Sequence, residues 1–162
     1  GNAAGARKDI ARIEVLREAL IAAKQGYWAE QVEIQRQVAA AWVARAEGKH
    51  QEALQLLRAA ADREDATEKH PVTPGPIAPA RELLGEMLLE LGDPRQALKE
   101  FEASHRVEPN RFKGLYGAAR AAELSGDREK ARTYYANLLA LCEKADTERP
   151  ELKEAKAFLA MK

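Results

Sequence analysis

The sequence predicts an all-α protein, and two observations carry that prediction. Alanine, the strongest helix former, supplies 33 of the 162 residues, whereas the β-branched residues Val, Ile and Thr together supply only 15. A pattern of small and bulky residues also repeats along the chain at a fixed spacing, which is typical of helical repeat proteins. A chain of this length can bury a core without disulfide or metal cross-links.

The composition excludes several classes of function. Basic and acidic residues balance at 26 each, so there is no electrostatic basis for binding a nucleic-acid backbone or an anionic membrane. The apolar runs fall far short of the roughly 20 residues that a membrane span needs. The lone Cys142 excludes an internal disulfide and a cysteine-based zinc site. A cytoplasmic location is favoured, and a periplasmic one stays open if a signal peptide precedes residue 1.

The repeat is clearest when Leu91-Gly92-Asp93 is aligned with Ser125-Gly126-Asp127, at an offset of 34 residues. Two further pairs repeat at the same offset: Ala97 with Ala131, and Phe101 with Tyr135. Weaker copies upstream keep the same order of glycine, alanine and bulky residue: Gly48, Ala53 and Leu57, and Gly1, Ala6 and Ile10. The pattern therefore covers nearly the whole chain, but its spacing breaks between Gly48 and Gly92, which are 44 residues apart, ten more than the period.

This pattern resembles the tetratricopeptide repeat, a helix-turn-helix unit of 34 residues with the signature W-x2-L-G-x2-Y…A-x3-F…P. The clearest copy has Leu84-Gly85-x2-Leu88, then Ala97-x3-Phe101, then Pro109. The stretch from His70 through Tyr116 also resembles the C-terminal part of large, multi-repeat bacterial members of this family. The resemblance implies a right-handed α-solenoid of helix-turn-helix repeats with a C-terminal capping helix.

A single domain with eight helices follows from this pattern. The helices are expected at about 3–25, 28–47, 50–66, 79–91, 94–106, 111–125, 128–144 and 149–160. The expected segments are the second helix of a truncated repeat at 1–26, a repeat at 27–66, a proline-rich insertion at 67–79, repeats at 80–109 and 110–144, and a capping helix at 145–162.

The first helix lacks a partner in this alignment, because Gly1-Asn2 falls on the turn inside a repeat. We therefore expect the chain to begin inside a longer array; the alternative is that residues 1–5 are a tag remnant and the first helix is an N-terminal cap. The helix over 6–24 has an apolar stripe that we expect to be exposed and to drive formation of a homo-oligomer: Ile10, Ile13, Leu16, Leu20 and Ile21.

Local signals mark the turns between the other helices. Gly92 and Gly126 end first helices, because glycine adopts the left-handed conformation without strain. The side chains expected to cap the helices that follow such turns are Asp93, Asp127 and Asn110, with Pro94 at a first helical position and Pro150 in the first turn of the last helix. The insertion has four prolines between Pro71 and Pro79, which predicts an extended connector. It is either a lengthened surface loop or a segment that folds over one face or is recognised by a partner.

The repeat register also predicts the core. Small residues are expected where helices cross closely: Gly85, Ala97, Ala119 and Ala131. Phe101 and Tyr135 are expected to fill the space between neighbouring units. The last helix is expected to cover the end of the array with Leu152, Ala155 and Leu159, and Cys142 beneath it to be a buried, inert thiol.

No residues in the sequence have the spacing of a catalytic or metal site. His50, His70 and His105 have no second ligand at a recognised spacing, and Ser104, Ser125 and Cys142 lack the signature of an activated nucleophile. The carboxylates Glu82, Glu86 and Glu90 share one helix face, where a solvated acidic stripe is the expected arrangement. We therefore predict no enzyme activity, no metal and no cofactor.

The family resemblance implies recognition of a protein or peptide in a groove lined by first helices. The expected groove residues are Val38, Trp42, Arg45, Glu82, Glu86, Leu89, Lys113, Tyr116, Arg120 and Glu123. Some family members clamp an acidic tail with basic groove residues, but Glu82 and Glu86 stand at the matching positions, so a partner of mixed charge or with a basic central segment fits better. Glu86 and Arg120 either pair with each other or are free for the partner. The alternative function is an architectural segment or a self-association module.

Overall fold

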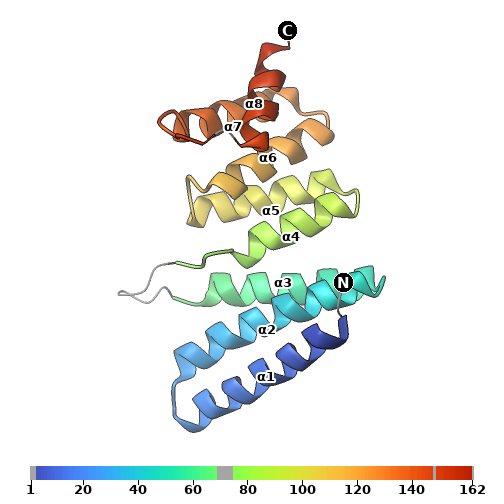
Figure 1. Ribbon diagram of the computed structural model, residues 1–162, viewed down its shortest axis with the longest axis vertical. Helices are drawn as coiled ribbons and strands as arrows, with labels where there is room; N and C mark the ends of the chain where they lie inside the picture. Colours follow the sequence, from blue (N-terminus) through green and yellow to red (C-terminus); the bar gives the residue numbers. More distant parts are fainter. Residues whose placement is uncertain (1–2, 69–74, 148, 162) are drawn as a thin grey trace. The chain divides into compact units, whose positions relative to one another are not determined.

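The computed structural model describes residues 3–68, 75–147 and 149–161 of the chain. These residues form eight α-helices and no strands (Figure 1). The helices are α1 (Ala3–Ala22), α2 (Gly26–Ala46), α3 (His50–Ala66), α4 (Ala80–Glu90), α5 (Pro94–Val107), α6 (Phe112–Leu124), α7 (Arg128–Leu141) and α8 (Pro150–Ala160). The predicted all-α class is confirmed. His70 and the first prolines of the insertion lie outside the described residues.

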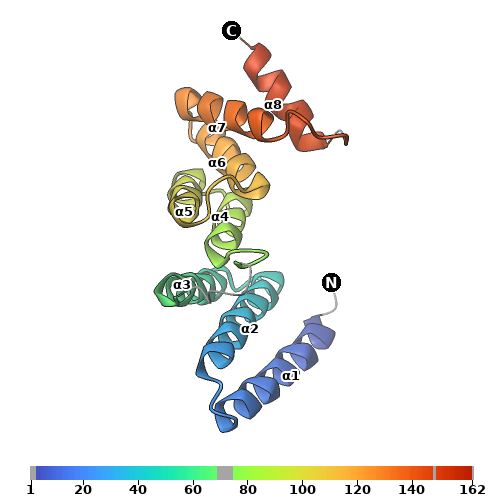
Figure 2. The ribbon, with the colours of Figure 1, turned by 90° about the vertical axis from the view of Figure 1, so that its left-hand side faces the viewer.

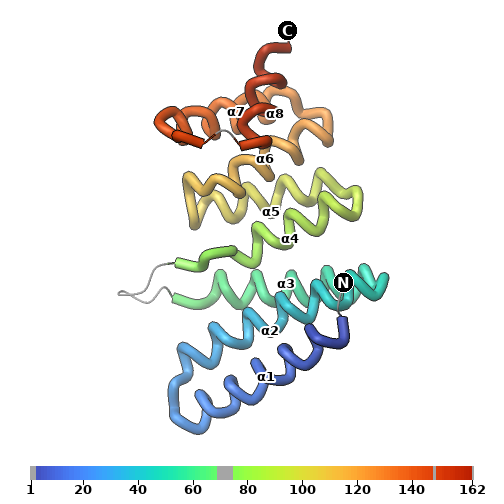
Figure 3. Tube along the Cα trace, viewed as in Figure 1, coloured from blue at the N-terminus to red at the C-terminus, as the bar shows by residue number. Residues whose placement is uncertain are grey.

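The helices pack into two compact units, Gly1–Leu84 and Gly85–Lys162. The boundary falls inside α4, so residues 80–84 belong to the first unit and residues 85–90 to the second. In the first unit α2 packs against both α1 and α3. In the second unit α6 packs against α5 and α7, and α7 also packs against α8, as the tube in Figure 3 traces. The finer division into repeats stays a prediction.

The glycine turns have the conformation that the sequence predicted. Gly92 and Gly126 have φ angles of +80° and +85°, and Gly48 has a φ of +77° at the matching place in the first unit. These are left-handed values, which side chains with a Cβ rarely adopt. Glycine is therefore the residue best suited to the turns after α2, α4 and α6.

Two of the three expected caps are confirmed. The side chain of Asp93 accepts a hydrogen bond from the backbone N–H of Gln96 at 3.1 Å, and Asp127 accepts one from Lys130 at 3.1 Å. The expectation for Asn110 is wrong, because α6 begins one residue later and Arg111 is at its cap position without a side-chain hydrogen bond. Asn110 instead has a φ of +59°, so it forms the left-handed turn before α6.

The core of the second unit is built around Phe101. Its ring is fully buried, and a Cβ placed on Gly85 of α4 or on Gly117 of α6 would lie 2.8 Å and 2.3 Å from it. The predicted close-contact residues Ala97, Ala119 and Ala131 are all fully buried. Small residues therefore let α4, α5 and α6 approach one large ring.

Helix α8 covers α7 with a slightly different face from the one predicted. Leu152 and Ala155 are buried as expected, but the third buried residue is Phe158, and Leu159 is only half-buried. The ring of Phe158 lies 5.0 Å from the ring of Tyr135, which is 1% exposed. The larger aromatic side chain covers Tyr135, so the helix turns Phe158 inward in place of Leu159.

Helix α1 lies along α2 in the first unit (Figure 2), and no residue of α1 is buried. The exposed side chains include Val15 at 68%, Leu16 at 52% and Ile21 at 46%. Ile10, Ile13 and Leu20 are half-buried, so the expected exposure of the stripe is wrong at these three positions, because α1 packs against α2. Among the described residues, no helix has the length and apolar character needed to cross a membrane.

Candidate peptide-binding surface

A hollow of about 430 Å³ opens on the second unit between α4, α6 and α8, and we call it the α6 hollow. Its lining residues are Glu86, Leu89, Phe112, Lys113, Tyr116, Gly117, Arg120, Leu124 and Glu151. Five of them belong to the groove predicted from the sequence: Glu86, Leu89, Lys113, Tyr116 and Arg120. The fold therefore brings half of the predicted groove residues to one surface.

One face of α6 supplies most of this surface. Lys113, Tyr116, Arg120 and Leu124 follow one another at spacings of three or four residues, so they share a face. Leu124 ends the row and is 55% exposed. The sequence could have identified Leu124 as a lining residue, because it continues the spacing of Tyr116 and Arg120. It could not have identified Glu151, because α8 brings this residue to the hollow from a distant part of the chain.

Both basic side chains of the hollow already have carboxylate partners. Lys113 Nζ lies 3.4 Å from Glu86 Oε1, and Arg120 Nη1 lies 2.8 Å from Glu123 Oε2. Arg120 thus pairs along its own helix, and Glu86 pairs with Lys113. The arrangement differs from the Glu86–Arg120 pair considered from the sequence, because the i, i+3 spacing puts Glu123 within direct reach of Arg120.

Glu123 contributes to packing between α6 and α7 and does not line the hollow. Its Oε2 atom accepts a hydrogen bond at 2.8 Å from the hydroxyl of Tyr135, whose ring is buried. Burial and this hydrogen bond to Glu123 raise the pKa of Tyr135. Arg120, Glu123 and Tyr135 form a chain of polar contacts that fixes the guanidinium of Arg120 beside the hollow.

Tyr116 is fixed by α8. Its hydroxyl donates a hydrogen bond to Glu154 Oε2 at 2.5 Å, which joins α6 to the capping helix. Burial is the main reason, and this hydrogen bond the second, that the pKa of Tyr116 is raised to about 12. The tyrosine therefore stays protonated at neutral pH, and it lines the hollow.

The other predicted groove residues lie outside the α6 hollow. Val38, in α2, is 9% exposed, and Trp42 and Arg45 on the same helix are half-buried. Glu82 is 2% exposed, so the expected solvated acidic stripe is wrong at this position, although Glu90 is exposed. The reason is that the buried residues of α4 extend around most of the helix, so that little of its circumference faces water: Ala80, Glu82, Leu84, Gly85, Met87 and Leu88.

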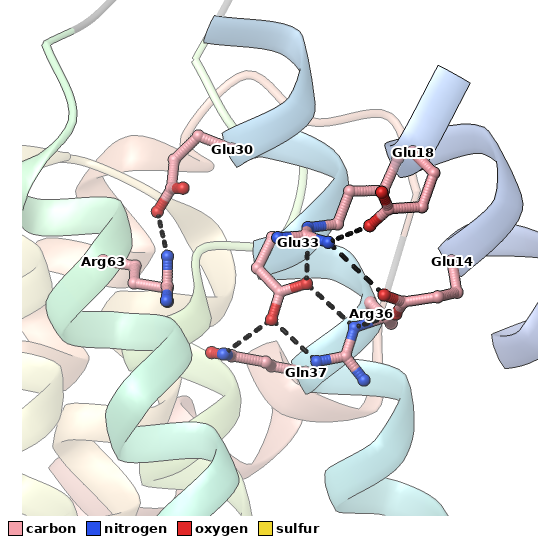
Figure 4. Close-up of polar contacts among 8 residues, drawn as sticks. Glu14, Glu18, Glu30, Glu33, Arg36, Gln37 and Arg63 are labelled. Carbon is pink, nitrogen blue, oxygen red and sulfur yellow. Dashed lines mark hydrogen bonds and ion pairs between the residues drawn. The ribbon is translucent and has the colours of Figure 1, made fainter. Parts of the chain in front are cut away.

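A polar cluster that the sequence analysis missed joins α1 to α2 (Figure 4). Its centre is Glu33, which is 6% exposed and accepts hydrogen bonds from Arg36 at 2.7 and 2.8 Å and from Gln37 at 2.9 Å. Arg17 of α1 reaches the same carboxylate at 3.1 Å. The hydrogen bonds from Arg36 lower the pKa of Glu33, although its burial acts in the opposite direction.

Glu14 completes the cluster by contacting both arginines. Its carboxylate lies 2.9 Å from Arg36 Nε and 3.3 Å from Arg17 Nη1. Glu18 also contacts Arg17, at 2.7 Å. Three carboxylates thus surround two guanidinium groups, an arrangement that holds α1 against α2. Only two local spacings were visible in the sequence: Glu14 with Arg17 on α1, and Glu33 with Arg36 and Gln37 on α2.

The remaining reactive side chains form no site in the part of the chain that the structure describes. His50 is exposed at the start of α3, and His105 packs edge-on against Tyr134 with ring centroids 6.3 Å apart. Within the described ranges, no cluster of His, Cys, Asp or Glu could hold a metal ion. Cys142 is half-buried at the C-terminal cap of α7, so the expected burial of its thiol is wrong. The helix ends there, three residues earlier than expected, and the turn leaves the side chain at the surface.

Comparison with known proteins supports the fold. No protein-family model matches the chain. A segment of 47 residues is 49% identical to outer dynein arm-docking complex subunit 4 of Xenopus laevis, and it covers 29% of this chain and 9% of that protein. The crystal structure of PcrH from Pseudomonas aeruginosa aligns with a TM-score of 0.59 over 78% of this chain and 88% of that chain, at 19% sequence identity.

The first comparison concerns a short piece of a much longer protein, and the second, at its low sequence identity, concerns the fold alone. The structural alignment agrees with the all-helical fold seen here. This chain therefore has a tetratricopeptide-like helical-repeat fold.

Proposed function

We propose that the chain is a non-catalytic protein-interaction module that binds a peptide or a partner helix in the α6 hollow. Folds of this type are non-enzymatic scaffolds, and helical repeats bind extended partners on their first-helix faces. The observation that carries the proposal is Leu124, an apolar side chain that is 55% exposed beside Leu89 and Tyr116 at the edge of a hollow. A partner that covers this side chain removes apolar surface from water.

The composition of the hollow favours a partner of mixed charge. Lys113 and Arg120 are balanced by Glu86 and Glu151 in the lining. Trp42 and Arg45, half-buried on α2, are proposed as a separate contact site on the first unit. Aromatic and arginine side chains of this kind supply much of the free energy of many interfaces.

Selection from a phage-displayed library of random 12-residue peptides tests this proposal. Affinities of selected peptides are then measured by fluorescence polarisation for the wild-type chain, Leu124→Gln and Leu141→Gln. Leu141 is the matched control, because it is an exposed leucine at the end of α7, outside the hollow. We expect Leu124→Gln to weaken binding about tenfold, which corresponds to ~1.4 kcal/mol of lost apolar contact, and Leu141→Gln to leave it unchanged.

A photo-crosslinking amino acid at each of these two positions provides an independent measurement. Crosslinking of the selected peptide at position 124 and not at position 141 supports the α6 hollow as the binding site. Equal loss of affinity in both leucine variants, or crosslinking at position 141 alone, would contradict it.

Self-association through α1 is a second candidate function. The exposed Val15, Leu16 and Ile21 favour it, because contiguous apolar surface of this kind drives association. It would make the chain an architectural segment and not a receptor for peptides.

A further inference from the structure

One face of α1 is left uncovered by the rest of the first unit, and we call it the α1 outer face. Its residues follow one another at spacings of three or four, so they lie on one side of the helix, and all of them are exposed: Lys8, Ala11, Arg12, Val15, Glu18, Ala19 and Ala22. The middle of the face is apolar, because Val15 is 68% exposed between two alanines, and Leu16 beside it is 52% exposed. A partner on this face would remove apolar surface from water.

The N-terminal half of this face has an excess of positive charge. Lys8 and Arg12 are exposed, and among the described residues neither forms an ion pair. Arg7 is already paired with Glu47 at the end of α2. The only acidic residue between Ala3 and Arg12 is Asp9, so it cannot balance both free cations.

The C-terminal half of the face has an excess of negative charge. Glu18 contacts Arg17 at 2.7 Å, within the polar cluster that joins α1 to α2 (Figure 4). That cluster has three carboxylates and two guanidinium groups, so one negative charge has no counterpart in it. Glu18 is its most exposed member, because its side chain is 62% exposed and that of Glu14 is 44% exposed. Lys24 lies beyond the face, in the turn after α1.

We propose that two copies of this chain pair through their α1 outer faces in antiparallel orientation, with Val15 at the two-fold axis. Residues equally far from Val15 on its two sides then face each other. Arg12 and Glu18 are each three residues from Val15, so Arg12 of each copy lies opposite Glu18 of the other. This inference rests on self-association through α1, the second candidate function, and it is independent of the α6 hollow.

Charge complementarity selects this orientation. A parallel pair would place Arg12 against Arg12 and Glu18 against Glu18, and like charges in direct opposition disfavour a complex. The antiparallel pair places opposite charges together twice and brings the alanines at positions 11 and 19 against each other, so that the backbones can approach closely beside Val15.

Disulfide cross-linking tests the orientation. Cys142, the only cysteine of the chain, is first replaced by serine, and Ala11→Cys, Val15→Cys and Ala19→Cys are then made singly at exposed positions. A disulfide forms only where two Cα atoms lie within about 7 Å, and in an antiparallel pair only the residue at the axis faces its own copy. We expect Val15→Cys to link to itself on mild oxidation, and Ala11→Cys to link to Ala19→Cys in a mixture of the two variants.

Charge reversal tests the contact between Arg12 and Glu18. We expect Arg12→Glu and Glu18→Arg each to weaken association about tenfold, because each puts like charges opposite one another at two symmetry-related places. The double variant restores opposite charges and should associate as the wild type does. Arg58→Glu is the control, since Arg58 is an exposed arginine on α3. Sedimentation equilibrium measures association, and circular dichroism checks that each variant is folded.

The outcomes separate this inference from the candidate function on which it rests. If the wild type associates but Ala11→Cys and Ala19→Cys each link to themselves, or if Arg58→Glu weakens association as much as Arg12→Glu, the inference is wrong while self-association stands. A wild-type chain that stays monomeric at high concentration would contradict both. Neither result bears on peptide binding in the α6 hollow.

Discussion

At the scale of single residues, Phe101 determines how closely three helices approach. Its ring lies against the backbone at Gly85 and Gly117. A Cβ atom added at either glycine would lie closer to the ring than van der Waals contact allows. Gly117 also lines the α6 hollow. The same glycine therefore provides space for the core on one side and for the hollow on the other.

Gly117→Ala should lower the free energy of unfolding by about 1–3 kcal/mol, because the added methyl group overpacks a buried ring. Gly26→Ala is the matched control, since a Cβ at Gly26 meets nothing within 4 Å. It should change stability little or raise it, because alanine favours the helix. Urea unfolding followed by circular dichroism measures both. Equal stability of the two variants would mean that the ring of Phe101 does not restrict position 117.

Glu33 makes the stability of the first unit depend on pH. Its pKa in the folded state is below the usual value of 4.5, so the unfolded chain binds the proton more readily. The stabilisation is therefore fully present above about pH 4.5 and is lost as the pH falls through the lower folded-state pKa. Glu33→Gln should be less stable than the wild type at pH 7 by about 2 kcal/mol.

This difference should shrink as the pH falls below about 4, because protonation removes the same charge from the wild type. Thermal unfolding at several pH values measures it. Glu52→Gln, at an exposed position of α3, serves as the control and should show a small difference throughout. A gap between Glu33→Gln and the wild type that stays constant down to pH 3 would contradict the role of Glu33.

At the scale of helices, local signals predicted the boundaries well. Glycine followed by aspartate predicted the turn and cap before α5 and α7, because both act within a few residues of the chain. Asn110 was misassigned for a related reason, since asparagine suits both a cap and a left-handed turn. The sequence could not show which of these two roles the backbone takes.

The caps can be ranked by substitution. Asp127→Ala should destabilise the chain by about 1 kcal/mol, because the N–H of Lys130 loses its acceptor. Gln25→Ala should cost much less, because the side chain at this exposed cap position of α2 makes no capping hydrogen bond. Urea unfolding compares the two variants. A cost for Asp127→Ala no larger than that for Gln25→Ala would show that the cap of α7 is not maintained by Asp127.

Contacts between distant helices were beyond the reach of the sequence. The repeat register placed Lys113, Tyr116 and Arg120 on one face, because helical spacing is a local property. It did not predict that Glu151 joins them or that Arg17 contacts Glu33, since α8 and α1 supply these residues from distant positions. The burial of Glu82 was not predicted, because the regular spacing of Glu82, Glu86 and Glu90 does not show how much of the surface of α4 other helices cover.

At the scale of the whole molecule, α1 is the most exposed helix. It has no buried residue, whereas each of α2, α3 and α5 through α8 has at least three within the described parts of the chain. Val15 and Leu16 therefore present apolar surface that the rest of the first unit leaves open to solvent.

Sedimentation equilibrium should detect association of the wild-type chain at high concentration, and Leu16→Glu should abolish it. The reason is that a charge in the centre of an apolar contact is costly to bury. Val107→Glu is the control, because Val107 is equally exposed, at 52%, but lies at the end of α5. A strictly monomeric wild type would remove self-association as a function of this helix.

The positions of the two tryptophans allow unfolding of the first compact unit to be followed separately from unfolding of the whole chain. Trp28 and Trp42 are the only tryptophans in the sequence, and both lie in α2 of the first unit. Intrinsic tryptophan fluorescence therefore reports on residues 1–84, while circular dichroism reports on all the helices. If the two curves coincide during unfolding in urea, the units unfold as one cooperative system, and if they separate, the difference gives the stability of the second unit without any added label.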